Sequence, residues 1–190
     1  SYTDGQGTDE SVTSAGVGPV ANINDAPVGL PVITGVVTED QLLSADTSGI
    51  SDADGLGAFS YQWLRDGGSI AGATASSYTL GDADVGALIR VVVSYTDLQG
   101  TAESVTSVST AAVANVNDAP TGTVSISGTP TEDQTLTASN TLADDDGLGA
   151  ITYQWQRDGV AIAGATATTY TLDDIDVGTT ITVVASYTDG

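Results

Sequence analysis

The stretch Phe59-Ser60-Tyr61-Gln62-Trp63-Leu64-Arg65-Asp66-Gly67 decides the fold, because large apolar side chains recur at every second position. The pattern returns at residues 151–159 as Ile-Thr-Tyr-Gln-Trp-Gln-Arg-Asp-Gly. A period of two predicts a β-strand with one buried face, and the Asp-Gly that follows predicts a tight turn. We therefore expect Trp63 and Trp155 to lie in a hydrophobic core and not to serve as stacking platforms for sugars.

Further strands are expected on both sides of this stretch. Residues 89–95 and residues 181–187 carry apolar side chains at alternate positions, as a half-buried strand requires. Residues 105–116, and the similar residues 12–23, form another expected strand. Turn signals rich in Asp and Gly separate the strands, and no helical period is visible. About seven short strands in each repeat predict an all-β sandwich.

The whole chain follows a repeat of roughly 93 residues. Ser-Tyr-Thr-Asp occurs at residues 1–4, 94–97 and 186–189. Asn-x-Asn-Asp-Ala-Pro occurs at residues 22–27 and 115–120. This periodicity predicts tandem domains of one kind.

The repeat divides the chain into three expected parts. Residues 1–25 are expected to be the last strand and the linker of a preceding repeat. Residues 26–118 form a complete repeat, and residues 119–190 form a repeat that lacks its last strand. Either the chain is a window on a longer periodic polypeptide, or this frame has a meaning of its own.

The composition restricts the partners of the chain. Its 190 residues contain 25 acidic side chains against three Arg, for a net charge of −22, and they contain no His or Cys. Such a chain repels nucleic acid and anionic membrane surfaces, and no apolar run approaches the ~20 residues of a membrane span. We therefore expect no nucleic-acid binding and no membrane insertion, and we expect cations as partners.

The acidic residues fall in loops that a sandwich would bring together at its two ends. Two carboxylates about 4 Å apart repel by about 4 kcal/mol at an effective dielectric constant of 20, so a cluster of them favours a bound cation. Oxygen ligands in this number are typical of Ca²⁺, whereas zinc prefers His and Cys, and magnesium rarely uses all-protein cages. The expected calcium ligands where the two repeats meet are Glu39, Asp82, Asp84, Asn115, Asn117, Asp118, Asp144, Asp146 and Asp189. An upper junction of the same kind is expected from Asn22, Asn24, Asp25, Asp52, Asp54 and Asp97.

Other carboxylates have a simpler interpretation. Asp9, Asp46, Asp66 and Asp158 are expected to serve turn chemistry alone. For Asp84 and its copy Asp176, a structural role competes with metal binding, because an aspartate in a turn can accept hydrogen bonds from backbone amides.

Two known families resemble parts of the chain. Trp63-Leu64-Arg65-Asp66-Gly67, followed by Tyr78-Thr79-Leu80 and Asp84-Val85-Gly86, resembles strands C to E and the E–F corner of immunoglobulin-like domains, without their Cys pair. Asn-x-Asn-Asp-Ala-Pro resembles the interdomain linker of cadherins and of bacterial cadherin-like repeats. The whole unit resembles the repeats of large bacterial adhesins exported by type I secretion, which commonly bind calcium. The resemblance implies tandem immunoglobulin-like or cadherin-like β-sandwiches at the extracellular surface of a bacterium, with roles in cell adhesion and biofilms.

Several functions stay open at this point. An enzyme is not expected, because the chain offers no His base and no Cys or Lys nucleophile. The favoured hypothesis is a rod of repeats stiffened by Ca²⁺, which projects from a cell or links cells and surfaces. One alternative is a module that binds glycans or other cell-surface molecules. The other is a fibre of identical chains, assembled head to tail by strand donation from residues 1–25.

Overall fold

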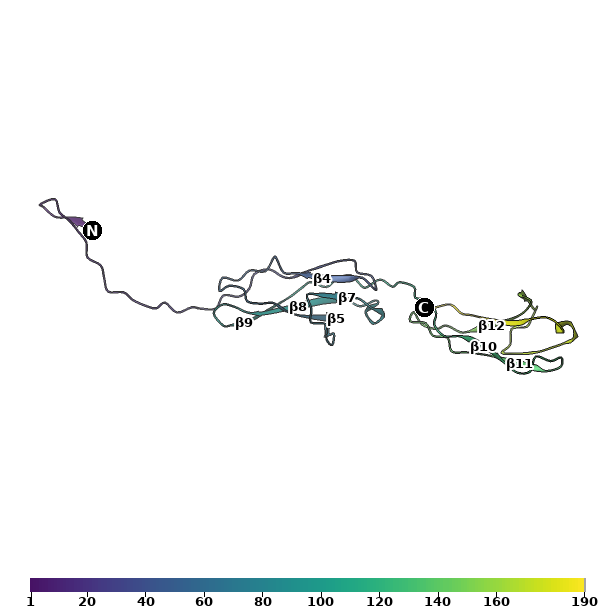
Figure 1. Ribbon diagram of the computed structural model, residues 1–190. Coiled ribbons are helices and arrows are strands. Elements are labelled where there is room, and N and C mark those ends of the chain that lie inside the picture. Colours follow the sequence, from purple (N-terminus) through teal and green to yellow (C-terminus); the bar gives the residue numbers. More distant parts are fainter. Residues whose placement is uncertain (190) are drawn as a thin grey trace. The chain divides into compact units, whose positions relative to one another are not determined.

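The computed structural model describes residues 1–189, and its regular structure is almost entirely β (Figure 1). The strands form several small sheets, and the helical elements described are two single 3₁₀ turns, η1 (Asp82–Asp84) and η2 (Asp174–Asp176). The expected all-β class is confirmed. Along residues 1–189, no helix has the length and apolar character that crossing a membrane requires.

The chain separates into two compact units that do not coincide with the sequence repeats. The first unit is Ser1–Val36, Leu42–Tyr78 and Leu88–Ala111, and the second is Val37–Gln41, Thr79–Ala87 and Ala112–Gly190. Two turns of the first repeat (residues 26–118) therefore belong with the linker and the second repeat (residues 119–190). All nine residues expected to bind calcium where the repeats meet lie in this second unit.

The first repeat forms two small sheets. One has the order β3-β4-β7, from β3 (Val32–Thr34), β4 (Leu42–Asp46) and β7 (Ser77–Thr79). The other has the order β6-β5-β8-β9, from β6 (Gly68–Ser69), β5 (Ser60–Arg65), β8 (Ile89–Thr96) and β9 (Ala102–Thr106). In the antiparallel pair of β5 and β8, Trp63 lies opposite Val91, and both side chains are fully buried. The expected core position of Trp63 is confirmed.

The N-terminal segment departs from the expectation. Residues 1–10 form a hairpin of β1 (Tyr2–Thr3) and β2 (Asp9–Glu10). The strand expected over residues 12–23 does not form, and this part of the chain runs without regular structure in Figure 1. Its apolar side chains are exposed, Val17 to 97% and Val20 to 93%. A strand exists only where another strand pairs with it, so sequence that favours a strand is not sufficient.

The second repeat also forms two sheets. One has the order β10-β11-β14, from β10 (Val124–Ser127), β11 (Thr135–Asn140) and β14 (Thr169–Thr171). The other has the order β13-β12-β15, from β13 (Val160–Ala161), β12 (Thr152–Arg157) and β15 (Ile181–Ser186). The core draws on both sheets, with Leu136, Ala138, Trp155 and Leu172 buried together. The core position of Trp155 is confirmed, and β15 is an edge strand of its sheet.

Polar contacts fix both tryptophans in the same way. The indole Nε1 donates to a backbone carbonyl twelve residues on, of Ala75 for Trp63 and of Ala167 for Trp155, at 2.9 Å in both repeats. A tyrosine ring lies against each indole, at centroid distances of 5.8 and 5.6 Å. Each indole therefore buries its surface without leaving its N–H unpaired.

Candidate metal centre

The first ligand candidate, Glu39, lies on a turn tied to two other segments. Thr38 forms a parallel bridge with Ala114, and the amide of Glu39 donates to the Ala114 carbonyl at 2.9 Å. The amide of Asp40, at a positive φ of 61°, donates to the Leu80 carbonyl at 3.1 Å. The turn therefore holds Glu39 next to the start of the linker.

The second ligand candidate, Asp82, begins the 3₁₀ turn η1. Directly after this turn, Val85 forms a parallel bridge with Val113, so the turn lies beside the same stretch of chain that holds Glu39. Asp82 itself is exposed, whereas Asp84, two residues on, is buried. The Oδ2 atom of Asp84 accepts from the amide of Gly81 at 3.0 Å, which closes the turn.

Three carboxylates meet at this place. Carboxylate oxygens of Glu39, Asp82 and Asp118 all lie within 4.8 Å of one another, and we call these residues the acidic cluster. Glu39 is only 1% exposed. Its Oε2 atom accepts from the amide of Val116 at 3.2 Å, whereas within the described part of the chain no donor reaches its buried Oε1 atom. An oxygen in this state costs free energy unless a positive group approaches it.

The electrostatics of the acidic cluster agree with its geometry. The amide of Val116 lowers the pKa of Glu39, but burial and the neighbouring carboxylates of Asp82 and Asp118 outweigh it, so the pKa of Glu39 is raised. Burial is also the largest cause of the raised pKa of Asp118, followed by the charge of Asp146. A divalent cation would offset the electrostatic repulsion that arises when these carboxylates are ionised together.

A second group of carboxylates lies beside the first. Oxygens of Asp144, Asp146 and Asp189 are also within 4.8 Å of one another. The two groups are joined by the linker, because the amide of Asp118 donates to Asp146 Oδ2 at 2.6 Å and Asn115 Nδ2 donates to Asp146 Oδ1 at 2.7 Å. The convergence expected from the sequence is therefore present in this unit. A hollow of about 380 Å³ adjoins them, lined by Asp82, Val85, Asn115, Asp145 and Asp146.

The upper set of expected ligands is brought together in part. The amide of Asp25 donates to Asp54 Oδ2 at 2.7 Å, and the amide of Asp54 donates to Asp52 Oδ1 at 2.8 Å. Asp97 is buried, and its Oδ1 atom accepts from the amides of Gln99 and Thr101. No donor reaches its Oδ2 atom along residues 1–189. Asp97 thus carries an unsatisfied oxygen of the same kind as Glu39.

The remaining expected ligands have other positions. Asn22 is exposed, and Asn24 Nδ2 donates to Glu103 Oε1 at 2.8 Å. Asn117 Nδ2 donates to the backbone carbonyl of Asp118 at 2.8 Å.

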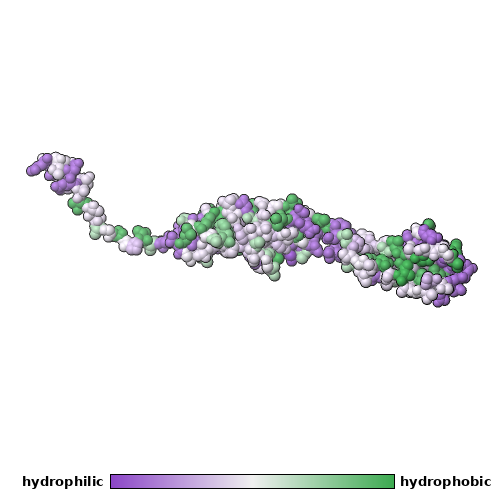
Figure 2. Space-filling view, in the orientation of Figure 1, coloured by the Kyte–Doolittle hydropathy of each residue, from purple (hydrophilic) through white to green (hydrophobic). Residues whose placement is uncertain are grey.

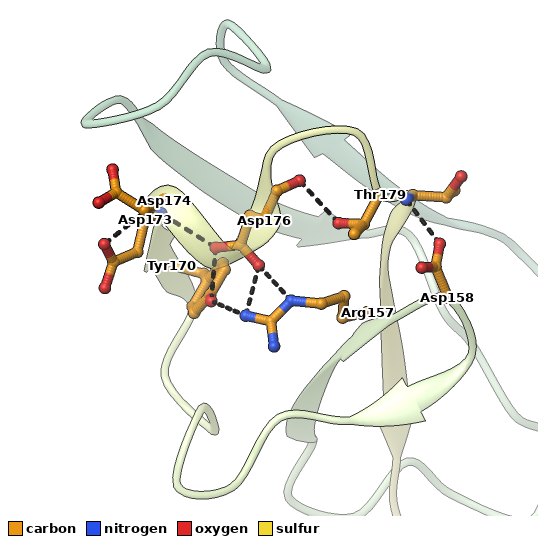
Figure 3. A network of polar contacts seen from close by, with 8 residues as sticks. Arg157, Asp158, Tyr170, Asp173, Asp174, Asp176 and Thr179 are labelled. Carbon is orange, nitrogen blue, oxygen red and sulfur yellow. Dashed lines mark hydrogen bonds and ion pairs between the residues drawn. The ribbon is translucent and has the colours of Figure 1, made fainter.

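Asp176, the copy of Asp84, belongs to a network of polar contacts with neighbouring side chains (Figure 3). Its Oδ1 atom accepts from Arg157 Nε at 2.6 Å and lies 2.5 Å from Arg157 Nη2. Its Oδ2 atom accepts from the Tyr170 hydroxyl at 2.8 Å and from the amide of Asp173 at 3.0 Å. The Arg157 cation already neutralises this carboxylate, so its environment favours the structural role over metal binding.

Of the four aspartates expected to serve turn chemistry, Asp46, Asp66 and Asp158 lie at turns, whereas Asp9 lies in strand β2. Asp66 and Asp158 both have a positive φ of 47° before glycine. Each Oδ1 atom accepts the backbone amide of the residue just before the neighbouring strand, Leu88 before β8 and Thr180 before β15. Asp46 accepts from the amide of Ser48 at 2.9 Å. Asp9 accepts from the Thr3 hydroxyl at 2.7 Å, across the N-terminal hairpin.

Sequence reasoning missed the tyrosines of the acidic loops. The Tyr95 hydroxyl donates to Asp52 Oδ2 at 2.5 Å, and the Tyr187 hydroxyl donates to Asp144 Oδ2. The bond to Asp144 is the largest cause that raises the pKa of Tyr187 to about 12. The signal was available, because each tyrosine lies two residues before an expected ligand in Ser-Tyr-Thr-Asp.

The donor set suits calcium best. All three ligand candidates of the acidic cluster offer carboxylate oxygens. Ca²⁺ takes 6–8 such ligands in flexible geometry, whereas Mg²⁺ demands a regular octahedron and retains its waters. The orphaned Oε1 atom of Glu39 is the observation that a bound cation would explain.

Comparison with protein-family models and with curated protein sequences finds no match to this chain.

Proposed function

We propose that this chain is a structural repeat region of an extracellular bacterial adhesin or fibre, in which Ca²⁺ stiffens the connection between repeats. In this proposal residues 26–118 are an immunoglobulin-like or cadherin-like β-sandwich, and residues 119–190 belong to a second one. The protein reaches the cell surface by type I secretion, and its role is mechanical and not catalytic. The sequence repeat and the acidic linker support this proposal.

One observation carries the calcium part of the proposal. Glu39 is buried, belongs to a group of three carboxylates, and has one oxygen atom that no donor among residues 1–189 satisfies. Burying such an atom is unfavourable unless a partner compensates for it. A buried carboxylate with an unsatisfied oxygen supports a bound cation more strongly than an exposed acidic cluster does.

The same pair of residues recurs in the second repeat, which fits a device used once in each repeat. Glu132 and Asp174 are the copies of Glu39 and Asp82. The pKa of Glu132 is raised, chiefly because Asp174 lies close enough to share a proton with it. A catalytic site is usually single, whereas a connecting device is repeated along the chain.

The proposed mechanism follows from charge. Without metal, the carboxylates of Asp82, Asp118 and Asp146 repel one another, and the linker between the repeats is free to bend. With Ca²⁺ bound, the charge is neutralised and one ion holds residues of the turn, the linker and the next repeat together.

Small-angle X-ray scattering tests this proposal. We expect the chain to adopt conformations of different length in solution. Excess Ca²⁺ should narrow the range of their maximum dimensions, and a chelator should widen it. Glu39→Gln should remove this response, whereas Glu10→Gln, the same change in the exposed N-terminal hairpin, should keep it. Identical scattering with Ca²⁺ and with chelator would contradict the proposed stiffening.

A further inference from the structure

Two short sequence motifs meet in each repeat. Ser-Tyr-Thr-Asp, at residues 94–97 and 186–189, lies at the end of β8 and of β15. Asp-x-Asp-Gly-Leu-Gly, at residues 52–57 and 144–149, forms the loop before β5 and before β12. Antiparallel pairing of β5 with β8, and of β12 with β15, brings each loop next to the end of the paired strand. The tyrosine of the first motif therefore lies beside the loop of the second.

In the second repeat, contacts between these motifs form a relay that reaches the linker. The Tyr187 hydroxyl donates to Asp144 Oδ2, and the Oδ1 atom of Asp144 accepts from the amide of Asp146 at 3.1 Å. Asp146 Oδ2 in turn accepts from the amide of Asp118 at 2.6 Å, and its Oδ1 atom accepts from Asn115 Nδ2 at 2.7 Å. Two carboxylates thus connect the tyrosine hydroxyl to Asp118, a member of the acidic cluster.

The first repeat has the same relay at the copy of this linker. The Tyr95 hydroxyl donates to Asp52 Oδ2 at 2.5 Å, and Asp52 Oδ1 accepts from the amide of Asp54 at 2.8 Å. Asp54 Oδ2 then accepts from the amide of Asp25 at 2.7 Å. Figure 2 shows hydrophilic residues gathered at the end of the first repeat that the chain enters, which is the end with this relay. The three bonds join the same atoms in both repeats, so the relay is a property of the repeat.

A glycine allows the loop to lie this close to the strand end. A Cβ atom on Gly57 would lie 2.0 Å from the carbonyl oxygen of Thr96, and one on Gly149 would lie 2.1 Å from that of Thr188. No side chain fits at such a distance, so only glycine permits this approach of two backbones. In each repeat the threonine directly follows the tyrosine. The loop is therefore held at its sixth residue by a backbone contact and at its first residue by the tyrosine hydroxyl.

The relay requires that each tyrosine keeps its hydroxyl hydrogen. The bond to Asp144 is the largest cause that raises the pKa of Tyr187 to about 12. Burial is the largest cause that raises the pKa of Tyr95, followed by the bond to Asp52. Both hydroxyls therefore stay protonated at neutral pH. A phenylalanine at either position keeps the ring and removes only this donor.

We propose that Tyr187 is a positioning residue of the calcium site, which holds the loop of Asp144 and Asp146 so that Asp118 lies at the acidic cluster. The hydroxyl acts through the two carboxylates and not as a ligand. Groups that orient metal ligands control metal affinity even though they do not touch the ion. The calcium part of this inference rests on the proposed function, whereas the relay itself holds the linker without metal. In the metal-free chain, the linker then bends on the first-repeat side of Asp118.

Hydrogen exchange of individual backbone amides, measured by NMR in excess chelator, tests the relay without calcium. Tyr187→Phe should speed exchange of the Asp118 amide at least about threefold and leave that of the Asp25 amide unchanged. Tyr95→Phe should do the reverse, so each variant is the matched control of the other. An Asp118 amide that Tyr187→Phe leaves unchanged would overturn the proposal. Equal acceleration of both amides by either variant would also overturn it, because that result reports only a lower overall stability.

The unaltered chain offers a measurement that does not depend on how well a variant folds. A hydroxyl hydrogen held between Tyr187 and Asp144 should exchange with water slowly enough to give its own proton NMR signal. A Tyr187 hydroxyl that exchanges as fast as that of an exposed tyrosine would overturn the proposal.

A calcium titration followed at the Val116 amide, which the Glu39 carboxylate accepts, tests the consequence for the metal. Tyr187→Phe should raise the calcium concentration at half-saturation at least about threefold. Tyr95→Phe should leave this concentration unchanged, and an equal value for Tyr187→Phe and the original chain would overturn the positioning role. A Val116 signal that calcium does not move in the original chain would instead contradict the proposed function. In that case hydrogen exchange in chelator still decides whether Tyr187 holds the linker, so the two failures are distinguishable.

Discussion

At the scale of single residues, the account rests on the Glu39 carboxylate. The side chain is buried, one of its oxygens accepts from Val116, and the other has no donor in the described chain. Replacing the carboxylate by an amide removes the charge and provides two hydrogens that can reach the neighbouring carboxylates. The substitution Glu39→Gln should therefore weaken metal binding and stabilise the metal-free fold.

We therefore predict opposite effects of Glu39→Gln in the two conditions. In excess chelator the variant should melt at a higher temperature than the original chain, because the repulsion from Asp82 and Asp118 is gone. Adding excess Ca²⁺ should raise the melting temperature of the variant little. It should raise that of the original chain, because an ion that binds only the folded state stabilises it. Differential scanning calorimetry measures both effects, with Glu10→Gln as the control.

At the scale of elements, a polar network holds the turn that contains η2. Asp176 accepts from Arg157, Tyr170 and the amide of Asp173, which connects β12, β14 and the turn itself. For its copy Asp84, the sequence left open whether the carboxylate binds metal or accepts hydrogen bonds from backbone amides. The structure shows the second, because Asp84 Oδ2 accepts from the amide of Gly81.

We predict that Asp176→Asn lowers the free energy of unfolding by about 2 kcal/mol, because it leaves donors of a mostly buried ion pair without their acceptor. The loss should be equal with Ca²⁺ and with chelator, as measured by urea denaturation. Asp173→Asn alters an exposed carboxylate of the same turn and should change stability by no more than about 0.5 kcal/mol. A loss for Asp176→Asn that appears only with Ca²⁺ would mean that the Asp176 carboxylate itself binds the ion, which would contradict its structural role.

The sequence predicted where strands lie along the chain better than it predicted which strands and side chains contact one another. Alternation of side chains located β5 and β12, since a buried face imposes a period of two whatever lies opposite. The same pattern predicted a strand over residues 12–23, and this was wrong because pairing depends on a neighbouring edge that local sequence does not describe. The convergence of Asp118 and Asp146 followed from loop positions, whereas the bonds of Tyr187 and Asp144 depend on side-chain directions that no pattern specifies.

At the scale of the whole molecule, the raised pKa values predict how stability depends on pH. A carboxyl with a raised pKa binds its proton more tightly in the folded chain than in the unfolded one, so stability falls as pH rises through the window between the two pKa values. Glu39, Asp118 and Glu132 have pKa values raised in this direction. The unfolded values lie near 4, so this window begins there and extends upward.

We accordingly predict that the metal-free chain melts at a higher temperature at about pH 5 than at about pH 7. The lowered pKa values of Asp97 and Asp176 act in the opposite sense, but that contribution is lost only at more acidic pH. Excess Ca²⁺ should reduce the difference, because the ion binds the ionised carboxylates and stabilises the chain most at neutral pH. Melting curves at the two pH values, with and without chelator, measure this, and a metal-free chain that is more stable at neutral pH would contradict it.

The most direct measurement is a crystal structure of the chain grown in millimolar Ca²⁺, with anomalous scattering collected to identify the ion. The account predicts a calcium peak about 2.3–2.6 Å from oxygen atoms of Glu39, Asp82 and Asp118, with the Oε1 atom of Glu39 among its ligands. A map in which only water separates these three carboxylates, at that calcium concentration, would contradict it.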